Sequence, residues 1–257
     1  MAMYCGVGGV QKEIGDLYCG IGGASKQLDN IYGGVGGVGK EIYSAVPSQP
    51  LSALSVGSML KLNETIGGVT TAEQFLVINH GYYGAEYTTL VRRYLFEPAM
   101  TFKQVAPAPA NFDFSDLKSW LNYTYYYYFD QKTKDALRWV YLPNSASGLS
   151  GMCVFMLSGT ELGYSSTGME DYQDSAMAYF ADSAKRVFKT RGGTSGSSWW
   201  TRSCNTDNIG NVFIVTGTGG LSTAMYTTSN LVLPAFCFSP NTKISLTTDI
   251  DGCYTLI

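Results

Sequence analysis

Three consecutive copies of a 14-residue unit occupy residues 4 to 45 of this 257-residue chain. Each copy places Tyr, two adjacent glycines, Lys and a closing aliphatic residue at the same offsets, in Tyr4–Ile14, Tyr18–Leu28 and Tyr32–Ile42. A fixed period indicates a repeated structural unit. Because a Gly-Gly pair accepts the positive φ angles of a two-residue type I′ turn, each copy predicts a β-hairpin. Three hairpins in succession predict a small meander.

A glycine-rich module of about 42 residues buries little core by itself, so we expect it to need another surface or copies of itself. Its glycines also fit Gly-x-Gly-x-x-Gly, the pattern of a dinucleotide site. No buried strand precedes them, no helix follows, and one cofactor does not need three copies. We therefore expect no cofactor. Pro47–Pro50 reads as a short extended linker, which divides the chain into residues 1–46, 47–50 and 51–257.

Composition limits the function classes. Apolar residues make up 45% of the chain, enough for a sizeable core, whereas charged residues make up only 14%. The net charge of −3 and the lack of a Lys/Arg cluster argue against binding to nucleic-acid phosphates. No apolar run is long enough for a transmembrane helix, and no signal peptide is visible, so we expect no membrane insertion. The six scattered cysteines favour free thiols in a reducing compartment, with one disulfide left open.

The second domain is expected to be α+β, with strands and helices in separate segments. Apolar or alternating runs predict strands at 59–62, 75–78, 87–96, 152–157, 199–203, 231–238, 243–248 and 253–257. Capping residues and 3.6-residue periodicity predict helices from Ser115 through Leu121, after Asp130, after Ser158–Glu161 and over Ala176–Ala184.

The stretch from Ser198 to Ser239 has apolar ends and a polar middle. Its ends carry Trp199, Trp200 and the Leu231–Phe238 run, which are typical of buried strands. Its middle, from Asn205 to Asn230, is rich in short polar side chains and Tyr. That composition is typical of an adaptable contact surface on a rigid frame. An ordinary loop-rich strand region is the alternative.

The sequence contains two candidate calcium sites and a single histidine. Asp249–Gly252 resembles half of a calcium loop but lacks the later ligands, so we favour a hairpin turn there. The acidic run Glu170–Asp174 could also bind calcium, although a solvated loop and helix start is favoured. His80 is the only histidine, and a structural or surface role is favoured over a metal or catalytic one. We therefore expect no metal.

An ordered set of motifs resembles a domain family common in gut bacteria and their phages, over about 200 residues. The motifs are Ser115–Asn122, Phe155–Gly163, Tyr179-Phe180, Trp199–Ser203 and Pro234–Cys237. Two positions depart from the family pattern, because Cys204 stands where Pro is usual and Leu233 where Arg is usual. The second change removes a charge that relatives are expected to bury.

The Trp-Trp-x-Arg-Ser…Pro-Ala-Phe layout also looks like the C-type-lectin-like fold of diversity-generating-retroelement variable proteins and formylglycine-generating enzymes. That resemblance implies a binding surface between the Trp motif and the last strand. The contact residues implied are Asn205, Asp207, Asn208, Asn211, Thr223 and Tyr226, and the scaffold residues are Trp199, Trp200, Arg202, Pro234 and Phe236.

The N-terminal repeats resemble those at the start of phage tail and other virion proteins. Together the resemblances imply a virion surface protein, made in the host cytoplasm, whose residues 1–46 contact other virion proteins. The remaining domain would bind a host protein or glycan, in a homo-oligomer for which we expect a trimer. The alternative is a purely structural tail or head protein. An enzyme using Cys204 and Cys237 is the least favoured reading, because their spacing is not that of formylglycine-generating enzymes.

Overall fold

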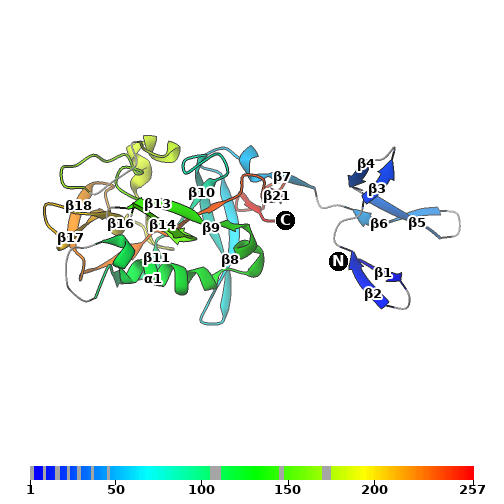
Figure 1. Cartoon of the computed structure of the whole chain (residues 1–257), viewed down its shortest axis with the longest axis horizontal. Helices are drawn as coiled ribbons and strands as arrows, with labels where there is room; N and C mark the ends of the chain where they lie inside the picture. The colour runs from blue at the N-terminus through cyan, green and yellow to red at the C-terminus, as the bar shows by residue number, and fades with distance from the viewer. Residues whose placement is uncertain are drawn as a thin grey trace. The chain divides into compact units, whose positions relative to one another are not determined.

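The computed structural model describes residues 3–7, 10–14, 18–21, 24–27, 30–35, 38–44, 47–104, 111–144, 148–169 and 175–257. The chain divides into two compact units, Met1–Pro47 and Ser48–Ile257. Ser48–Pro50, which we expected to belong to a linker, forms strand β7 and pairs with β21 (Lys243–Ser245) in the second unit (Figure 1).

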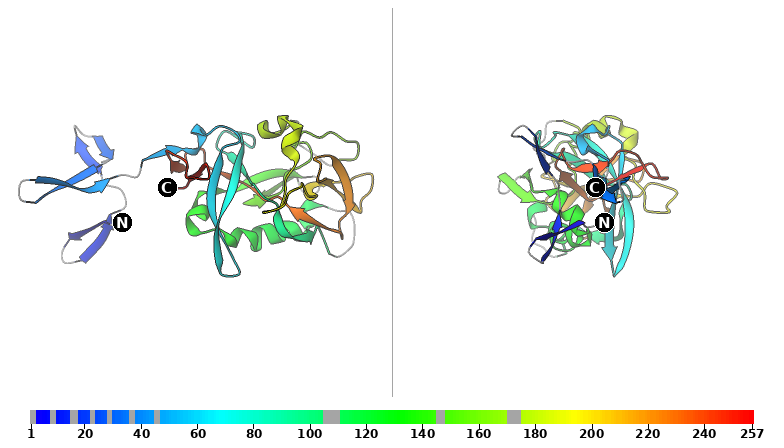
Figure 2. Two further views of the ribbon diagram at one scale, coloured as in Figure 1. Left: turned by 180° about the vertical axis from the view of Figure 1, so that it is seen from behind. Right: turned by 90° about the vertical axis from the view of Figure 1, so that its right-hand side faces the viewer.

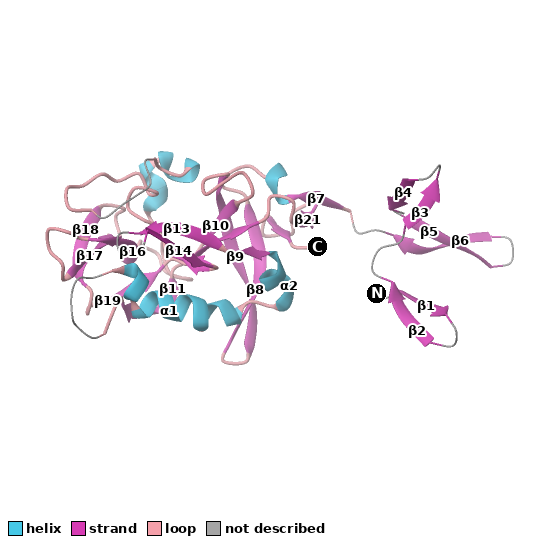
Figure 3. Cartoon of the chain, viewed as in Figure 1, coloured by secondary structure: helices cyan, strands magenta, loops and turns pink. Residues whose placement is uncertain are grey.

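The first unit consists of three β-hairpins (Figure 3). They are formed by β1 (Met3–Val7) with β2 (Val10–Ile14), β3 (Tyr18–Ile21) with β4 (Ala24–Gln27), and β5 (Asn30–Val35) with β6 (Val38–Ser44). The ladders close at Val7↔Val10, Ile21↔Ala24 and Val35↔Val38, so two residues separate each pair. The Gly-Gly pairs at these turns lie outside the described residues. Within the described residues each hairpin is its own two-stranded sheet and no joined meander forms.

The larger sheet of the second unit has seven strands. Their order is β12 (Leu137–Arg138), β20 (Ala235–Phe238), β10 (Thr88–Arg92), β9 (Val69–His80), β8 (Met59–Ile66) and β22 (Cys253–Thr255), and β15 (Val154–Phe155) also pairs with β20. Gly67 and Gly68, with φ of 57° and 83°, form the turn of the long β8–β9 hairpin (Figure 2). Positive φ at both positions is what a two-residue hairpin turn requires.

A five-stranded sheet carries the stretch that the sequence singled out. Its order is β11 (Phe96–Thr101), β19 (Ser229–Val232), β16 (Trp199–Cys204), β17 (Asn211–Val215) and β18 (Leu221–Met225). A separate hairpin joins β13 (Val140–Asn144) to β14 (Gly148–Met152). The predicted strand over 231–238 is interrupted at Leu233-Pro234, where the chain passes from the five-stranded to the seven-stranded sheet.

The core is strongly aromatic. Phe75, Phe129 and Phe236 form a triangle with ring centroids 5.2 to 5.9 Å apart, and all three are buried. Trp199 and Trp200 are fully buried on β16. Tilted and edge-on aromatic pairs of this kind stabilise a core beyond the area that they bury.

The prediction of an α+β, C-type-lectin-like fold is wrong, because the protein is β-rich and its described residues form several sheets with few helices. Among the described residues only one helix reaches seven residues, α1 (Asp116–Tyr123). The other helical segments are α2 (Gln131–Ala136) and the 3₁₀ turns η1 (Leu51–Ala53), η2 (Phe112–Phe114), η3 (Tyr125–Tyr128), η4 (Ala178–Ala181) and η5 (Ser183–Arg186).

Local hydrogen bonds explain why the predicted helices stay short. Ser158 and Glu161 form the expected reciprocal capping bonds, but Gly163, with φ of 77°, ends the segment after one turn. In the 176–184 segment, Asp182 is extended and its side chain accepts a hydrogen bond from the Ala184 amide, which starts a separate turn. Asp competes with the helix in this way because its carboxylate can bond nearby backbone groups.

Candidate binding surfaces

The five residues implied as scaffold lie in the interior. Trp199, Trp200 and Phe236 are fully buried, Pro234 is buried, and Arg202 is 7% exposed. The indole nitrogen of Trp200 donates a hydrogen bond to the Met100 carbonyl at 2.7 Å. This bond joins β16 to β11, two strands of the five-stranded sheet that are not adjacent. The strands therefore provide a rigid frame for the loops that follow them.

Arg202 is held by a buried ion pair. Its Nη1 and Nη2 lie 2.5 and 2.8 Å from the two carboxylate oxygens of Glu161, which is fully buried. The Tyr83 hydroxyl also donates to Glu161, at 2.6 Å. Burial raises the pKa of Tyr83 well above its usual value, so the phenol remains a neutral donor. Arg202 thus links β16 to the 158–163 turn, and its role is structural.

The implied contact surface begins at a loop built by Asn205, Asn208 and Asn211, which we call the polar loop (residues 205–211). The Asn205 side-chain oxygen accepts hydrogen bonds from the amides of Asp207 and Asn208 at 2.9 and 3.1 Å. The amide of Asn205 donates to the Asn211 carbonyl at 3.0 Å, and the amide of Asn211 donates to the Asn208 carbonyl at 2.8 Å. An Asn side chain that bonds the amides two and three residues ahead fixes a turn. The polar loop is therefore held in one shape by its own bonds.

The six implied contact residues differ in exposure. Asp207 and Asn208 are exposed at the tip of the polar loop, whereas Asn205, Asn211 and Thr223 are half-buried. Tyr226 is only 9% exposed and packs with the core. Because the residues that follow Tyr226 are polar, the sequence did not predict that its side chain is buried.

Two exposed apolar side chains lie within the same interval and were missed by the sequence reasoning. Ile209 is 54% exposed and Met225 is 57% exposed. The amide of Tyr226, next to Met225, donates to the Gly210 carbonyl at 3.1 Å, so the β18 end adjoins the polar loop. Apolar groups among polar ones are typical of protein-contact surfaces. We call the exposed residues Thr206–Ile209, Met225, Thr227 and Thr228 the tip face.

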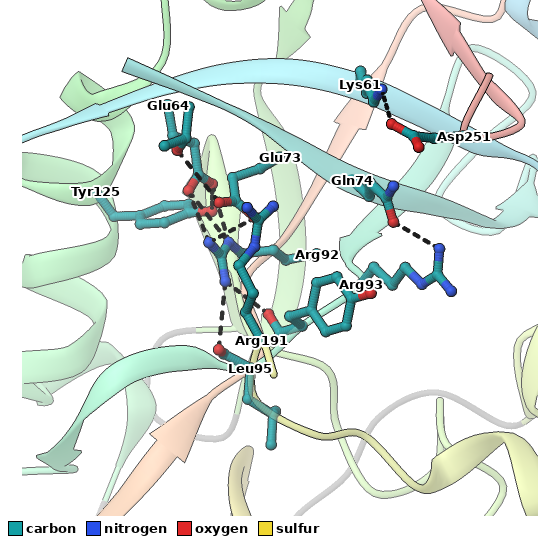
Figure 4. A network of polar contacts seen from close by, with 12 residues as sticks. Lys61, Glu64, Glu73, Gln74, Arg92, Arg93, Leu95, Tyr125, Arg191 and Asp251 are labelled. Atoms are coloured by element: carbon teal, nitrogen blue, oxygen red, sulfur yellow. Dashed lines mark hydrogen bonds and ion pairs between the residues drawn. The ribbon is translucent and has the colours of Figure 1, made fainter. Parts of the chain in front are cut away.

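A buried ionic network at the β8–β9 hairpin had no signal in the sequence (Figure 4). Arg92 Nη2 lies 3.2 Å from Glu64 and 3.0 Å from Glu73, and Tyr125 donates a hydrogen bond to Glu64. Burial raises the pKa of the Glu64 carboxyl although Arg92 and Tyr125 lower it. Arg191 Nη2 reaches the same oxygen of Glu73 at 3.0 Å. The network therefore ties the 189–193 loop to the larger sheet.

The family model described as a domain of unknown function (DUF6273) matches residues 86–240, more than half of the chain. The chain belongs to the DUF6273 family. No curated protein and no protein of solved structure matches it.

The DUF6273 match covers less than the folded unit. It begins before β10 and ends just after β20, so β8, β9 and β22 lie outside the matched residues. Yet β9 pairs with β10 along the sheet, and Arg92 of the matched part is neutralised by two carboxylates from β8 and β9. The DUF6273 domain of this protein is therefore built together with the preceding hairpin.

The other candidate residues, His80, Cys204 and Cys237, are bonded to or buried among neighbouring protein groups. Both nitrogens of His80 are within hydrogen-bond distance of protein groups, at 2.9 Å from the Thr88 hydroxyl and from the Leu54 carbonyl. Cys204 and Cys237 are buried thiols outside any disulfide, and Cys237 lies 3.4 Å from the Thr89 hydroxyl. Burial raises the pKa of Cys237 to about 12, so its thiol is protonated at neutral pH.

Neither calcium candidate gains support from the described residues. Asp249 accepts hydrogen bonds from the amides of Asp251 and Cys253 and lies 2.5 Å from the Lys61 ammonium, which also pairs with Asp251. Glu170–Asp174 lies outside the described residues. Over the described part of the chain there is no group of three or more His, Cys, Asp or Glu placed to hold a metal, and no helix suited to cross a membrane.

Proposed function

We propose that this DUF6273 protein is a non-catalytic virion protein of a bacteriophage, which attaches to the particle through residues 1–46 and binds the host surface through residues 51–257. The tip face is the observation that carries the proposal. Asp207 and Asn208 project from a polar loop that the Asn205 side chain holds in shape. A surface fixed before binding loses less conformational entropy when a partner docks.

The chemistry of the tip face favours a protein or glycan partner at the host surface. Its exposed side chains are a carboxylate, an amide, hydroxyls and two apolar groups, Ile209 and Met225, with no described lysine or arginine among them. Amides and hydroxyls supply hydrogen bonds, and the two apolar groups supply area that a partner can bury. Nucleic acid is a poor fit because the face offers no cation for phosphates.

The repeated hairpins support attachment through the first unit. Three hairpins of the same two-residue spacing offer three similar edges to neighbouring virion proteins or to other copies of the chain. We propose that the protein is displayed as a homo-oligomer, a trimer, on the virion surface after synthesis in the host cytoplasm.

Phage carrying Asp207→Ala with Asn208→Ala tests this proposal. We expect intact particles that adsorb to host cells at least tenfold more slowly than the parent. The matched control is Asp135→Ala with Asn241→Ala, which removes the same two side-chain types from exposed positions outside the tip face. Failure of the Asp207/Asn208 variant to assemble would instead favour the purely structural role, and normal adsorption would reject the tip face as a receptor surface.

A further inference from the structure

A hollow with an unusual concentration of positive charge lies beside the β8–β9 hairpin. It has a volume of about 360 Å³, and Met59 and Leu76, which are paired across the ladder, form part of its lining. The segment from Tyr179 to Lys189 and the residues Arg93-Tyr94 complete it. A second hollow of about 440 Å³ shares Tyr94 with the first and includes Lys61, Gln74, Arg191 and the acidic Asp251, which pairs with Lys61. None of these residues belongs to the tip face.

Three cations line the first hollow, and none of its described lining residues is acidic. They are Arg93, Lys185 and Lys189, and none of the three forms an ion pair with a described residue. The nearest acidic neighbour in sequence, Asp182, caps the Ala184 amide and forms no ion pair with a described residue. In a chain of net charge −3, such a group of unpaired cations creates a local positive potential that attracts anions.

Two of the three cations, Arg93 and Lys185, contact uncharged partners. Arg93 Nη1 donates to the Gln74 side-chain oxygen at 2.6 Å (Figure 4). The same nitrogen lies 3.0 Å from the Met59 sulfur. The Lys185 ammonium lies 5.0 Å from the centre of the Tyr179 ring. Because neither partner carries a charge, both cations keep their charge available to a ligand.

Aromatic and apolar groups share the hollow with these cations. The guanidinium groups of Arg93 and Arg191 lie 5.4 and 5.8 Å from the centre of the Tyr94 ring. Tyr94 and Tyr179 are half-buried, and Val187 is 44% exposed. Arg191, which lines the second hollow, is in turn paired with the buried Glu73, so the Tyr94 ring packs against an anchored guanidinium. A bare inorganic anion would use the cations and would not bury the apolar surface of the hollow.

We propose that the hollow binds an acidic saccharide, whose acid group lies between Arg93 and Lys185 and whose ring packs against Tyr179 and Tyr94. Sugars present one face of C–H groups that packs on aromatic rings, and their carboxylate or phosphate substituents pair with Arg and Lys. This site is separate from the tip face and does not depend on it. The shared chemistry is a sugar ring bearing an anion, whether a uronic acid or a sugar phosphate.

Calorimetric titration of the full chain tests the proposal with four probes: a glucuronic-acid-containing tetrasaccharide, glucose 6-phosphate, the neutral cellotetraose and inorganic phosphate. We expect at least one acidic sugar to bind, at least tenfold more tightly than cellotetraose and than inorganic phosphate. The preferred acidic probe identifies carboxylate or phosphate as the acid group. Affinity should fall as salt rises, because the pairing is ionic.

Substitutions in the hollow test whether the acidic sugar binds there. Lys185→Gln with Lys189→Gln changes only exposed side chains and should weaken the acidic sugar at least tenfold, whereas Lys243→Gln, an exposed lysine outside the hollow, should not. Tyr179→Phe should retain binding and Tyr179→Ala should lose it, with an unchanged unfolding midpoint showing that the variant is folded. The proposal is overturned if no acidic sugar binds at millimolar concentration, if inorganic phosphate binds as tightly, or if the double lysine variant binds normally.

Discussion

The guanidinium of Arg191 lies 3.0 Å from the carboxylate of Glu73, although 118 residues separate the two in the chain. The Glu73 side chain is 5% exposed and the Arg191 side chain is 53% exposed, so the pair runs from the interior to the surface. The buried Arg92 guanidinium contacts the same Glu73 carboxylate oxygen. This relationship connects the buried network of the larger sheet to the loop that borders the proposed saccharide site.

Arg92→Leu should destabilise the domain strongly. The change leaves Glu64 and Glu73 buried without their shared cation, and loss of one partner of a buried ion pair costs about 3–5 kcal/mol. Arg191→Leu, the matched control, removes an exposed member of the network and should cost about 1 kcal/mol or less. Urea unfolding followed by tryptophan fluorescence measures both. Equal losses for the two variants would show that burial does not set the strength of this network.

Tyr226→Ala should lower stability rather than remove a contact residue. The ring is 9% exposed, and truncation of a buried aromatic side chain costs about 3–5 kcal/mol. Asn208→Ala, at the exposed tip of the polar loop, should change stability by about 0.5 kcal/mol or less. Thermal unfolding by circular dichroism separates these outcomes. A Tyr226→Ala protein as stable as the parent would mean that the ring does not belong to the core.

Asp130 should make the stability of α2 depend on pH. Burial acts to raise the pKa of its carboxyl, but hydrogen bonds from Thr133 and Asn63 outweigh burial and lower the pKa below its ordinary value of 3.8. A lowered folded pKa stabilises the protein above pH 3.8, and that stabilisation is lost as pH falls through the folded pKa.

Asp130→Asn keeps a capping oxygen and removes the charge. The difference in unfolding free energy between parent and variant should therefore be largest near pH 7 and shrink below about pH 4. Urea unfolding from pH 3 to pH 7 measures the difference. If the difference is constant over this range, the charge of Asp130 plays no part.

Cys237 should resist alkylation in the folded protein. Burial raises the pKa of its thiol to about 12, and the side chain is fully buried, so little thiolate forms at pH 8 and reagent cannot reach it. Iodoacetamide treatment followed by peptide mapping should find Cys237 unlabelled in the native chain and labelled in urea. Rapid native labelling would revive the reactive-cysteine reading of Cys204 and Cys237.

Local sequence signals predicted local structure well. The Ser115 hydroxyl caps α1 by accepting from the Lys118 amide at 3.0 Å, and the apolar run at Phe75–Ile78 lies buried in β9. In the repeats, the hairpin spacing agrees with the Gly-Gly pattern. Each of these features depends on residues a few positions apart, which is the range over which capping and periodicity operate.

The features that failed depend on distant residues. The α+β prediction overestimated helix because Asp182 and Gly163 end their segments through bonds that periodicity does not reveal. No local sequence pattern predicts the pairing of Arg92 with Glu64 or the burial of Tyr226. Tyr94 and Lys185 meet at one hollow only because the Arg93–Leu95 segment after β10 lies against the 179–189 segment, where the Leu95 amide donates to the Lys189 carbonyl. The proposed saccharide site therefore could not be predicted from the sequence.

The most direct test of host binding is the equilibrium binding of purified, fluorescently labelled full chain to intact cells of the host bacterium. The parent and the Asp207→Ala/Asn208→Ala variant are compared at matched stability. We predict saturable binding by the parent and at least a tenfold weaker affinity for the variant. Absence of parent binding to credible hosts, or equal binding by the variant, would contradict the role assigned to the tip face.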